Sequence, residues 1–293
     1  MKLILISDLH LLSKQPKARL DNAVETCFKK LAYVVRRAYG MQAPILVAGD
    51  FFDQPRDWYV FKHLIETISG VEIYSIFGQH DTYKYSEKTR SATNLGVLSA
   101  LSDDVTILEA APTKLEGVRV YGCHVGQDIP APKDTKSLNI LVIHAPISLE
   151  KAAFAHFNAK SFLHDNPKYN LILCGDIHKK FVYEEKGAII CNTGPMIRKT
   201  VAEWNHEPTF FVYDTDNQDL VEVTIPHEAA EQVLSREHIE VEERREGLMQ
   251  KFIDKVGKVK MGSTKLVKNI TKFLKANDMP QEVKEILDGL INE

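Results

Sequence analysis

The sequence predicts an α/β fold in which parallel strands present polar side chains at one edge of a sheet. Five short apolar runs end abruptly in acidic, amide or imidazole side chains. The runs and the polar residues after them are residues 3–6 with Asp8 and His10, 45–48 with Asp50, 71–77 with Gln79 and His80, 141–143 with His144, and 171–174 with Asp176 and His178. Such runs are typical of strands buried on both faces. Sites in open α/β sheets lie beyond the carboxyl ends of the strands, so we expect these eight side chains to converge.

Two amphipathic helices are expected between the first three strands. Residues 19–38 carry apolar side chains at intervals of three and four from Leu20 to Ala38, and Gly40 follows as a stop signal. Residues 58–69 repeat this spacing before Gly70. The first third therefore has the order β-α-β-α-β, which implies parallel pairing with right-handed crossovers.

The middle of the chain is predicted to add strands and hairpins. We expect a short helix over residues 94–100 and a loop over 127–136, where Pro130 and Pro132 lie. Strands are expected over residues 105–108, 113–121 and 138–143, and hairpins over 181–191 and 209–224.

The ligand atoms expected at the sheet edge are nitrogen and oxygen only. The set is too large for one four-coordinate metal and suits two ions that share a bridging carboxylate. Asp8 and His10 are two residues apart at one strand end, and Asp176 and His178 repeat that spacing. Both members of each pair can therefore face the same ion.

The order of these motifs resembles the calcineurin-like metallophosphoesterase superfamily. The motifs are Asp-x-His, Gly-Asp, Gly-(Asn/Gln)-His-Asp, a single His after a strand, and Gly-x-x-His. Within the superfamily, the Gly-Asp-Phe-Phe-Asp-x-Pro segment from Gly49 and the Asn-Thr-Gly-Pro-x-x-Arg segment from Asn192 resemble SbcD-type nucleases of double-strand-break repair. The resemblance covers residues 1–215. It implies a four-layer α/β/β/α sandwich of two mixed sheets. The residues after Pro226 themselves predict a helical C-terminal segment.

The resemblance also implies which residues hold each ion. Asp8, His10, Asp50 and His178 would bind the first ion, and Asp50, Gln79, His144 and Asp176 the second. The family has Asn at the position of Gln79 and His at that of Asp176, and both replacements keep a ligand atom. The second site is richer in oxygen, so we take Mn²⁺ as the working cofactor, with Mg²⁺ as the alternative.

His80 is the candidate general acid, because it adjoins a ligand and projects differently from it. Asp81 can either orient His80 or cap the turn that follows. Asp53 can either contact the substrate or hold its loop.

Composition is that of an ordinary globular protein. The chain has 293 residues, of which 44% are hydrophobic and 26% charged. Its cysteines, Cys27, Cys123, Cys174 and Cys191, show no Cys-x-x-Cys spacing and are expected to be buried thiols. No signal segment or membrane-spanning run is visible, so we expect a cytoplasmic protein, or one in the host-cell cytoplasm if viral.

Charge is strongly segregated after Pro226. Residues 228–246 hold seven Glu against three Arg, and residues 251–275 hold eight Lys against one Asp. We expect a phosphoesterase domain over residues 1–226 and a helical, Lys-rich segment over 227–293 for contact with DNA or a partner. One face of that segment would carry Lys265, Lys268, Lys272 and Lys275. These lysines can either contact the phosphates of a nucleic acid or simply form a solvated helix face, and the sequence favours neither interpretation.

The leading hypothesis is a two-metal DNA nuclease, an exonuclease that processes DNA ends in repair, recombination or replication. The resemblance implies an SbcC-type coiled-coil ATPase as partner, and a homodimer is a further option. Two alternatives stay open: a phosphodiesterase for small nucleotides, and a non-catalytic scaffold that keeps the fold without the metals.

Overall fold

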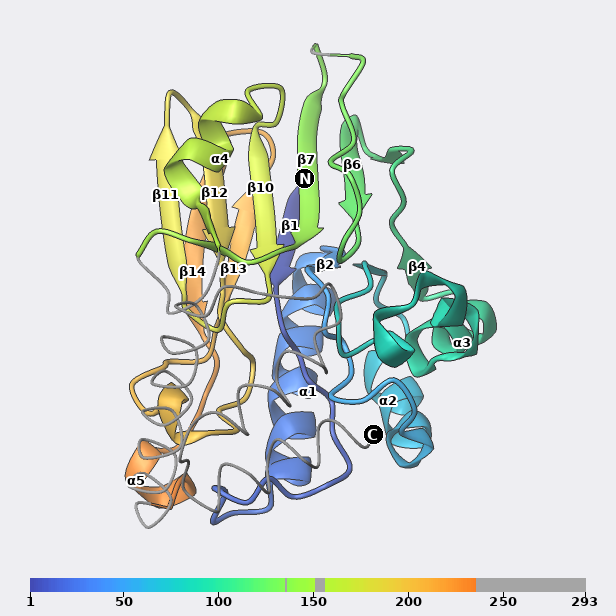
Figure 1. Cartoon of the computed structure of the whole chain (residues 1–293), viewed down its shortest axis with the longest axis vertical. Coiled ribbons are helices and arrows are strands. Elements are labelled where there is room, and N and C mark those ends of the chain that lie inside the picture. Colours follow the sequence, from blue (N-terminus) through green and yellow to red (C-terminus); the bar gives the residue numbers. More distant parts are fainter. Residues whose placement is uncertain (135, 151–155, 236–293) are drawn as a thin grey trace, which may run out of the picture. The chain divides into compact units, whose positions relative to one another are not determined.

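Two six-stranded sheets organise the part of the chain that the structure, a computed structural model, describes: residues 1–134, 136–150 and 156–235 (Figure 1). In spatial order, the first sheet has β14 (Asp219–Thr224), β13 (Thr209–Asp214), β1 (Lys2–Ile6), β2 (Ile45–Val47), β3 (Ile73–Ser75) and β4 (Val105–Ile107). The second has β11 (Phe181–Glu185), β12 (Ala188–Asn192), β10 (Leu171–Gly175), β7 (Leu138–His144), β6 (Val118–Cys123) and β5 (Thr113–Leu115).

Both sheets are mixed, with a parallel centre. The run β1-β2-β3-β4 is parallel, and β13 and β14 add antiparallel strands at one side. In the second sheet, β6, β7, β10 and β12 are parallel, and the edge strands β5 and β11 are antiparallel to their neighbours. The predicted α/β fold of two mixed sheets flanked by helices is confirmed.

Helices and short elements connect the strands. The helices are α1 (Ala23–Met41), α2 (Phe61–Ile68), α3 (Asn94–Leu101), α4 (Ala159–Asp165) and α5 (Ala230–Val233). The 3₁₀ turns are η1 (Trp58–Val60), η2 (Tyr83–Tyr85), η3 (Glu87–Ala92) and η4 (Val201–Glu203), and β8 (Ile147–Ser148) pairs with β9 (Phe157–Asn158).

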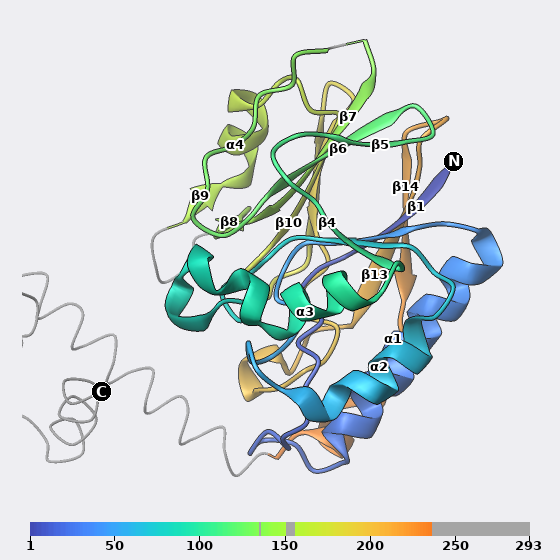
Figure 2. The same cartoon turned by 90° about the vertical axis from the view of Figure 1, so that its right-hand side faces the viewer.

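Within the described residues, three apolar cores lie between the layers of helices and sheets. Strand β1 is apolar at successive positions because its side chains enter two of these cores. Ile4 and Ile6 pack in the core that also holds buried side chains of α1, α2 and α3. Leu3 and Leu5 point the other way, into the core between the two sheets. Phe162 of α4 packs in a third core against the far face of the second sheet. Figure 2 shows α4 on one side of the sheets and α1 and α2 on the other.

Helix α1 begins later than predicted. The expected start at Arg19 is wrong, because Asn22 supplies a better cap: its side chain accepts the Glu25 N–H at 3.1 Å. Arg19 is instead buried before the helix, where its guanidinium pairs with Asp21 at 2.7 Å. At the other end, Gln42 adopts a left-handed conformation with φ of 51° and closes the helix.

The single strand predicted over residues 113–121 is a hairpin. Strands β5 and β6 are antiparallel and are joined by Glu116 and Gly117, whose φ angles of 38° and 89° are both positive. Such angles belong to the tight turns that match the twist of a hairpin. The sequence predicts one strand here because residues 113–121 are β-type on both sides of Glu116-Gly117, and this dipeptide is a weak turn signal.

The C-terminal predictions lie largely outside the described residues. Met1–Leu234 forms one compact unit, to which α5 belongs. The division after residue 226 stays a prediction, and Lys265, Lys268, Lys272 and Lys275 lie beyond the described ranges. Over the described ranges, no helix has the length and apolar character needed to cross a bilayer.

Gly175 provides a test of how closely the two sheets approach at their carboxyl ends. A Cβ atom at Gly175 would lie 2.3 Å from the carbonyl oxygen of Ala48, the residue after β2, so Gly175→Ala forces the backbones apart at the ends of β10 and β2. We expect the free energy of unfolding to fall by about 2 kcal/mol or more, measured by urea denaturation. Gly40→Ala is the matched control. Gly40 is in α1, and a Cβ atom there would meet nothing within 4 Å, so that change should raise stability by about 0.5–1 kcal/mol. Equal effects of both changes would contradict the proposed close approach.

Candidate metal centre

The carboxyl ends of five strands from both sheets meet at one place. Asp8 and His10 follow β1, Asp50 follows β2, Gln79 and His80 follow β3, His144 ends β7, and Asp176 and His178 follow β10. The structure therefore brings together the polar residues that the sequence singled out. Which of them bind metal stays a prediction.

The Asp50 carboxylate lies between two groups of side chains. It is fully buried, with Oδ2 3.8 Å from His10 Nε2 and Oδ1 3.6 Å from His144 Nε2. On the first side, His178 Nε2 is 3.0 Å from His10 Nε2. Asp8, His10 and His178 have ligand atoms within 4.8 Å of one another, as do Asp8, Asp50 and His144. This is the position expected of a carboxylate shared by two cations.

On the second side, Gln79 and Asp176 gather around His144. Gln79 Oε1 lies 2.6 Å from His144 Nε2, and Gln79 Nε2 lies 2.5 Å from Asp176 Oδ1. His144 Nε2 is also 3.9 Å from Asp176 Oδ1. The two residues that depart from the family pattern are thus neighbours, and the longer Gln79 side chain still reaches the same cluster as the histidine.

The acceptor atoms at this centre fit a bound cation. Asp8 Oδ2 and Asp50 Oδ2 are buried and have no hydrogen-bond partner. His144 Nδ1 is 2.7 Å from the Ala48 carbonyl oxygen, which can only accept, so Nδ1 carries the proton. His144 Nε2 faces Gln79 Oε1, and Nε2 is the nitrogen that this ring can offer to a cation. Buried carboxylate oxygens without a donor cost free energy, and a divalent ion among nitrogen and oxygen ligands removes that cost.

The backbone at the centre is held in an uncommon conformation. Asp8, His10, Asp50 and Asp176 have φ angles of 50°, 46°, 47° and 99°. Positive φ costs a non-glycine residue about 1 kcal/mol or more, and such residues cluster at functional sites. Hydrogen bonds secure the conformation: the His10 N–H donates to the Asp50 carbonyl at 2.9 Å, and the Asp176 N–H donates to Asp8 Oδ1 at 3.1 Å.

Asp81 ties two ligand-bearing loops together. Its buried carboxylate accepts the N–H groups of Phe51, Phe52 and Gly78 at 3.1, 3.0 and 3.0 Å. The first two belong to the loop after β2 and the third to the loop after β3. These contacts match neither of the two roles considered for Asp81, since they go neither to His80 nor to the turn that follows Asp81.

His80 is oriented by Asp53 instead. Its Nδ1 lies 2.8 Å from the Asp53 carbonyl oxygen and therefore donates, which leaves Nε2 4.0 Å from Asp50 Oδ2. The His80 side chain is 42% exposed, so a substrate can reach it. The Asp53 carboxylate lies 3.5 Å from His10 Nδ1 and 2.6 Å from Lys199 Nζ. Asp53 thus contacts two site histidines.

Glu203 is a site residue that the sequence reasoning missed. Its Oε1 accepts from His178 Nδ1 at 2.7 Å, and its Oε2 accepts the Thr200 N–H at 3.0 Å. Burial alone would raise the pKa of Glu203. The hydrogen bond and charge of His178, together with the N–H groups of Thr200 and Lys199, outweigh burial, and the pKa falls to about 2. A carboxylate behind a histidine fixes the ring nitrogen that faces a metal. The only sequence signal at Glu203 is the spacing Thr200-x-x-Glu203, which predicts a helix start and not a site residue. In the structure this pair does form a capping box at η4.

The Asn-Thr-Gly motif from Asn192 fastens the first ligand loop to the last. Ser7, just before Asp8, donates its N–H to Thr193 Oγ1 at 2.9 Å and its hydroxyl to Asn192 Oδ1 at 3.0 Å. Asn192 Nδ2 donates to the Ile177 carbonyl at 2.9 Å, beside His178. The motif therefore positions ligand loops from both sheets.

Asp50→Asn tests whether the centre is built for a cation. Without metal, we expect the variant to be more stable than the native protein by about 1 kcal/mol, because it loses a buried charge without a hydrogen-bonding partner on Oδ2. Mn²⁺ should raise the melting temperature of the native protein and leave that of the variant unchanged. The exposed Asp103→Asn is the control and should behave like the native protein. An Mn²⁺ response retained by Asp50→Asn would refute the assignment.

Glu203→Gln tests the support of His178. The amide keeps the shape but places an NH₂ group or a neutral oxygen where the charged carboxylate accepts hydrogen bonds. We expect Mn²⁺ affinity, measured by calorimetric titration, to fall about 10- to 100-fold. Glu207→Gln, an exposed neighbour, should have no effect. Native affinity in Glu203→Gln would show that His178 needs no such support.

Comparison with protein families matches residues 1–180 to calcineurin-like phosphoesterases. A search of curated protein sequences finds no match.

Similar solved structures include three from different organisms. An archaeal phosphodiesterase is 13% identical, over 76% of this chain and 99% of that one, with a TM-score of 0.46. The phosphopantetheinyl hydrolase of Mycobacterium tuberculosis is 12% identical, over 76% and 95%, with a TM-score of 0.45. Vps29 of Entamoeba histolytica, in complex with zinc, is 10% identical, over 77% and 100%, with a TM-score of 0.38.

The finer resemblance to SbcD-type nucleases has no counterpart among these matches and stays a prediction. The family match covers more than half of the 293 residues and includes every strand end that contributes to the candidate metal centre. The family implies metal-dependent hydrolysis of phosphoesters, which agrees with the clusters of candidate ligands. The chain therefore belongs to the calcineurin-like phosphoesterase family.

Proposed function

We propose that this chain is a metal-dependent DNA nuclease that hydrolyses phosphodiester bonds at DNA ends. It would use two divalent ions, with Mn²⁺ as the preferred cofactor, and would work with an SbcC-type coiled-coil ATPase. The observation that carries the proposal is the position of Asp50 between two ligand groups, with His80 beside it.

The residues of the centre divide the chemistry between them. Two ions bound there would activate a water molecule and neutralise the charge that develops on the phosphoryl oxygens. Asp50 holds both ligand groups in register, because its two oxygens face opposite sides. Asp53 and Glu203 keep the Nδ1 sides of His80 and His178 occupied, so that Nε2 of each ring faces the site.

His80 is the residue best placed to protonate the leaving oxygen. Its Nδ1 is bonded to a backbone carbonyl, and its Nε2 points toward the centre from a partly exposed ring. A proton carried on Nε2 can pass to the oxygen of the departing nucleotide. His80 is a neighbour of the ligands, so its removal should affect proton transfer more than metal binding.

Two features support DNA as the substrate. The segments from Gly49 and from Asn192 resemble SbcD-type nucleases, and the second of them positions the ligand loops. The lysines after residue 250 would add positive charge for a phosphate backbone, as expected for nucleic-acid binding. The partner ATPase would dock on residues 227–293, most of which lie outside the described ranges.

His80→Asn is the direct test. We expect release of nucleotides from linear duplex DNA to depend on Mn²⁺, to stop with chelator, and to fall about 100-fold or more in the variant. Calorimetric Mn²⁺ affinity should stay within a few fold of the native value. His164→Asn is the matched control, since the His164 side chain is 76% exposed on α4.

Other outcomes would select the alternatives. Cleavage of a small chromogenic phosphodiester with DNA left intact would indicate a small-nucleotide phosphodiesterase. Absence of Mn²⁺ binding would indicate a scaffold. DNA cleavage that persists in His80→Asn would remove His80 from the mechanism.

A further inference from the structure

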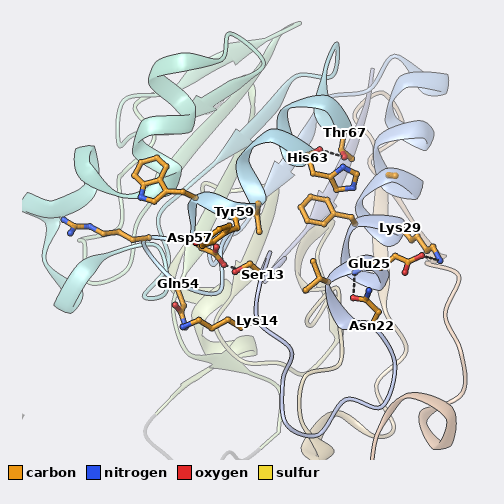
Figure 3. Close-up of a pocket in the computed structure, with 16 residues that line it drawn as sticks. Ser13, Lys14, Asn22, Glu25, Lys29, Gln54, Asp57, Tyr59, His63 and Thr67 are labelled. Carbon is orange, nitrogen blue, oxygen red and sulfur yellow. Dashed lines mark hydrogen bonds and ion pairs between the residues drawn. The ribbon is translucent and has the colours of Figure 1, made fainter.

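A cleft of about 1100 Å³ opens between α1 and the segment that carries η1 and α2. Figure 3 shows Lys14 and Gln54 at one end of it and His63 and Thr67 at the other. Its volume is slightly above the usual range for small-molecule sites. No residue of the proposed metal centre lines it, so it is a separate surface.

Two chain segments run side by side from the metal centre to the cleft. After His10 and Asp50, the segments are joined by a parallel bridge between Leu11 and Phe52, and the Asp53 N–H donates to the Leu11 carbonyl at 2.9 Å. The very next residue, Gln54, lines the cleft. Gln54 follows Asp53, whose carbonyl holds His80, so one end of the cleft lies one residue along the chain from the support of the proposed general acid.

The cleft combines an apolar floor with exposed aromatic rings. Val24, Phe28 and Val60 contribute apolar surface. Trp58 and Tyr59 stand on η1 with 54% and 92% of their surface exposed. Large exposed aromatic side chains at a concave surface offer flat faces on which a planar ligand can stack.

Positively charged side chains lie near these rings. The acidic side chains that line the cleft are instead paired with other groups of the protein. Lys14 and Arg56 are exposed, and the Arg56 guanidinium lies 5.5 Å above the ring of Tyr83. The Asp57 carboxylate is buried and accepts the Ser13 N–H at 3.0 Å, and Glu25 is paired with Lys29 at 2.6 Å. Positive charge beside stacking platforms is the signature of single-stranded nucleic-acid binding.

We propose that this cleft binds unpaired nucleotides of the strand whose phosphodiester lies at the metal centre. Trp58 and Tyr59 stack on bases, and Lys14 and Arg56 contact phosphates. The inference rests on the proposed nuclease function and deepens it: the preferred substrate is a strand with unpaired bases next to the cleaved bond, such as an overhang or a frayed end.

The test is binding of a fluorescently labelled short oligothymidylate in the presence of chelator, so that binding is measured without cleavage. We expect Tyr59→Ala and Trp58→Ala each to weaken binding about 5- to 100-fold, the usual loss for one stacked base. Tyr39→Ala is the matched control, since Tyr39 is an aromatic residue of α1 that is 71% exposed and does not line the cleft. It should bind as the native protein does. Tyr59 is almost wholly exposed, so its variant should fold normally even if Trp58→Ala does not.

The outcomes separate this inference from the proposed function. If both variants bind the oligonucleotide with native affinity, the proposal that the cleft binds nucleotides is wrong, even if Mn²⁺-dependent DNA cleavage is intact. A protein partner would then be the alternative occupant of the cleft. Weakened binding in both variants, with no DNA cleavage by the native protein, would support the cleft and overturn the nuclease. A native protein that neither binds the oligonucleotide nor cleaves DNA would overturn both.

Discussion

The buried carboxylate of Asp50 is the constraint on which the rest of the site depends. It is fully buried, one of its oxygens has no hydrogen-bond partner, and its two oxygens face separate ligand groups. Such a group is unfavourable in an apolar interior unless a cation compensates it. The two sheets end at this carboxylate, and the positive φ angles around it are the local strain that accompanies this placement of the candidate ligands.

A second layer of polar residues holds these candidate ligands in an ordered arrangement. Asp81 joins the loops after β2 and β3, Asp53 contacts His10 and His80, and Glu203 supports His178. Lys199 bridges to Asp53, so the loop after β12 connects with the loop after β2. Metal sites depend on such partners nearly as much as on the ligands, because the partners fix tautomer and orientation. The aromatic cleft begins at Gln54, next to Asp53, which links the position of His80 to the proposed path of a bound strand.

The sequence predicted the strands and the convergence of their ends because those features are encoded locally. A run such as residues 3–6 is apolar at every position since Ile4 and Leu5 face different cores, and the polar residues after it can only lie at the sheet edge. The start of α1 and the hairpin at Glu116 were missed because a cap and a tight turn depend on one or two residues within a longer pattern. Glu203 was missed for a different reason. Its contact with His178 joins residues 25 positions apart through the folding of the loop after β12, which no spacing rule encodes.

The central claim is that Asp50 is shared by two cations, and electron paramagnetic resonance of the protein titrated with Mn²⁺ tests it most directly. Two ions bridged by one carboxylate are close enough for their spins to couple, so the account predicts two equivalents bound per chain and a coupled signal at saturation. An isolated single-ion spectrum with one equivalent bound would contradict it, because Asp50 would then serve one ion and the two ligand groups would not form one centre.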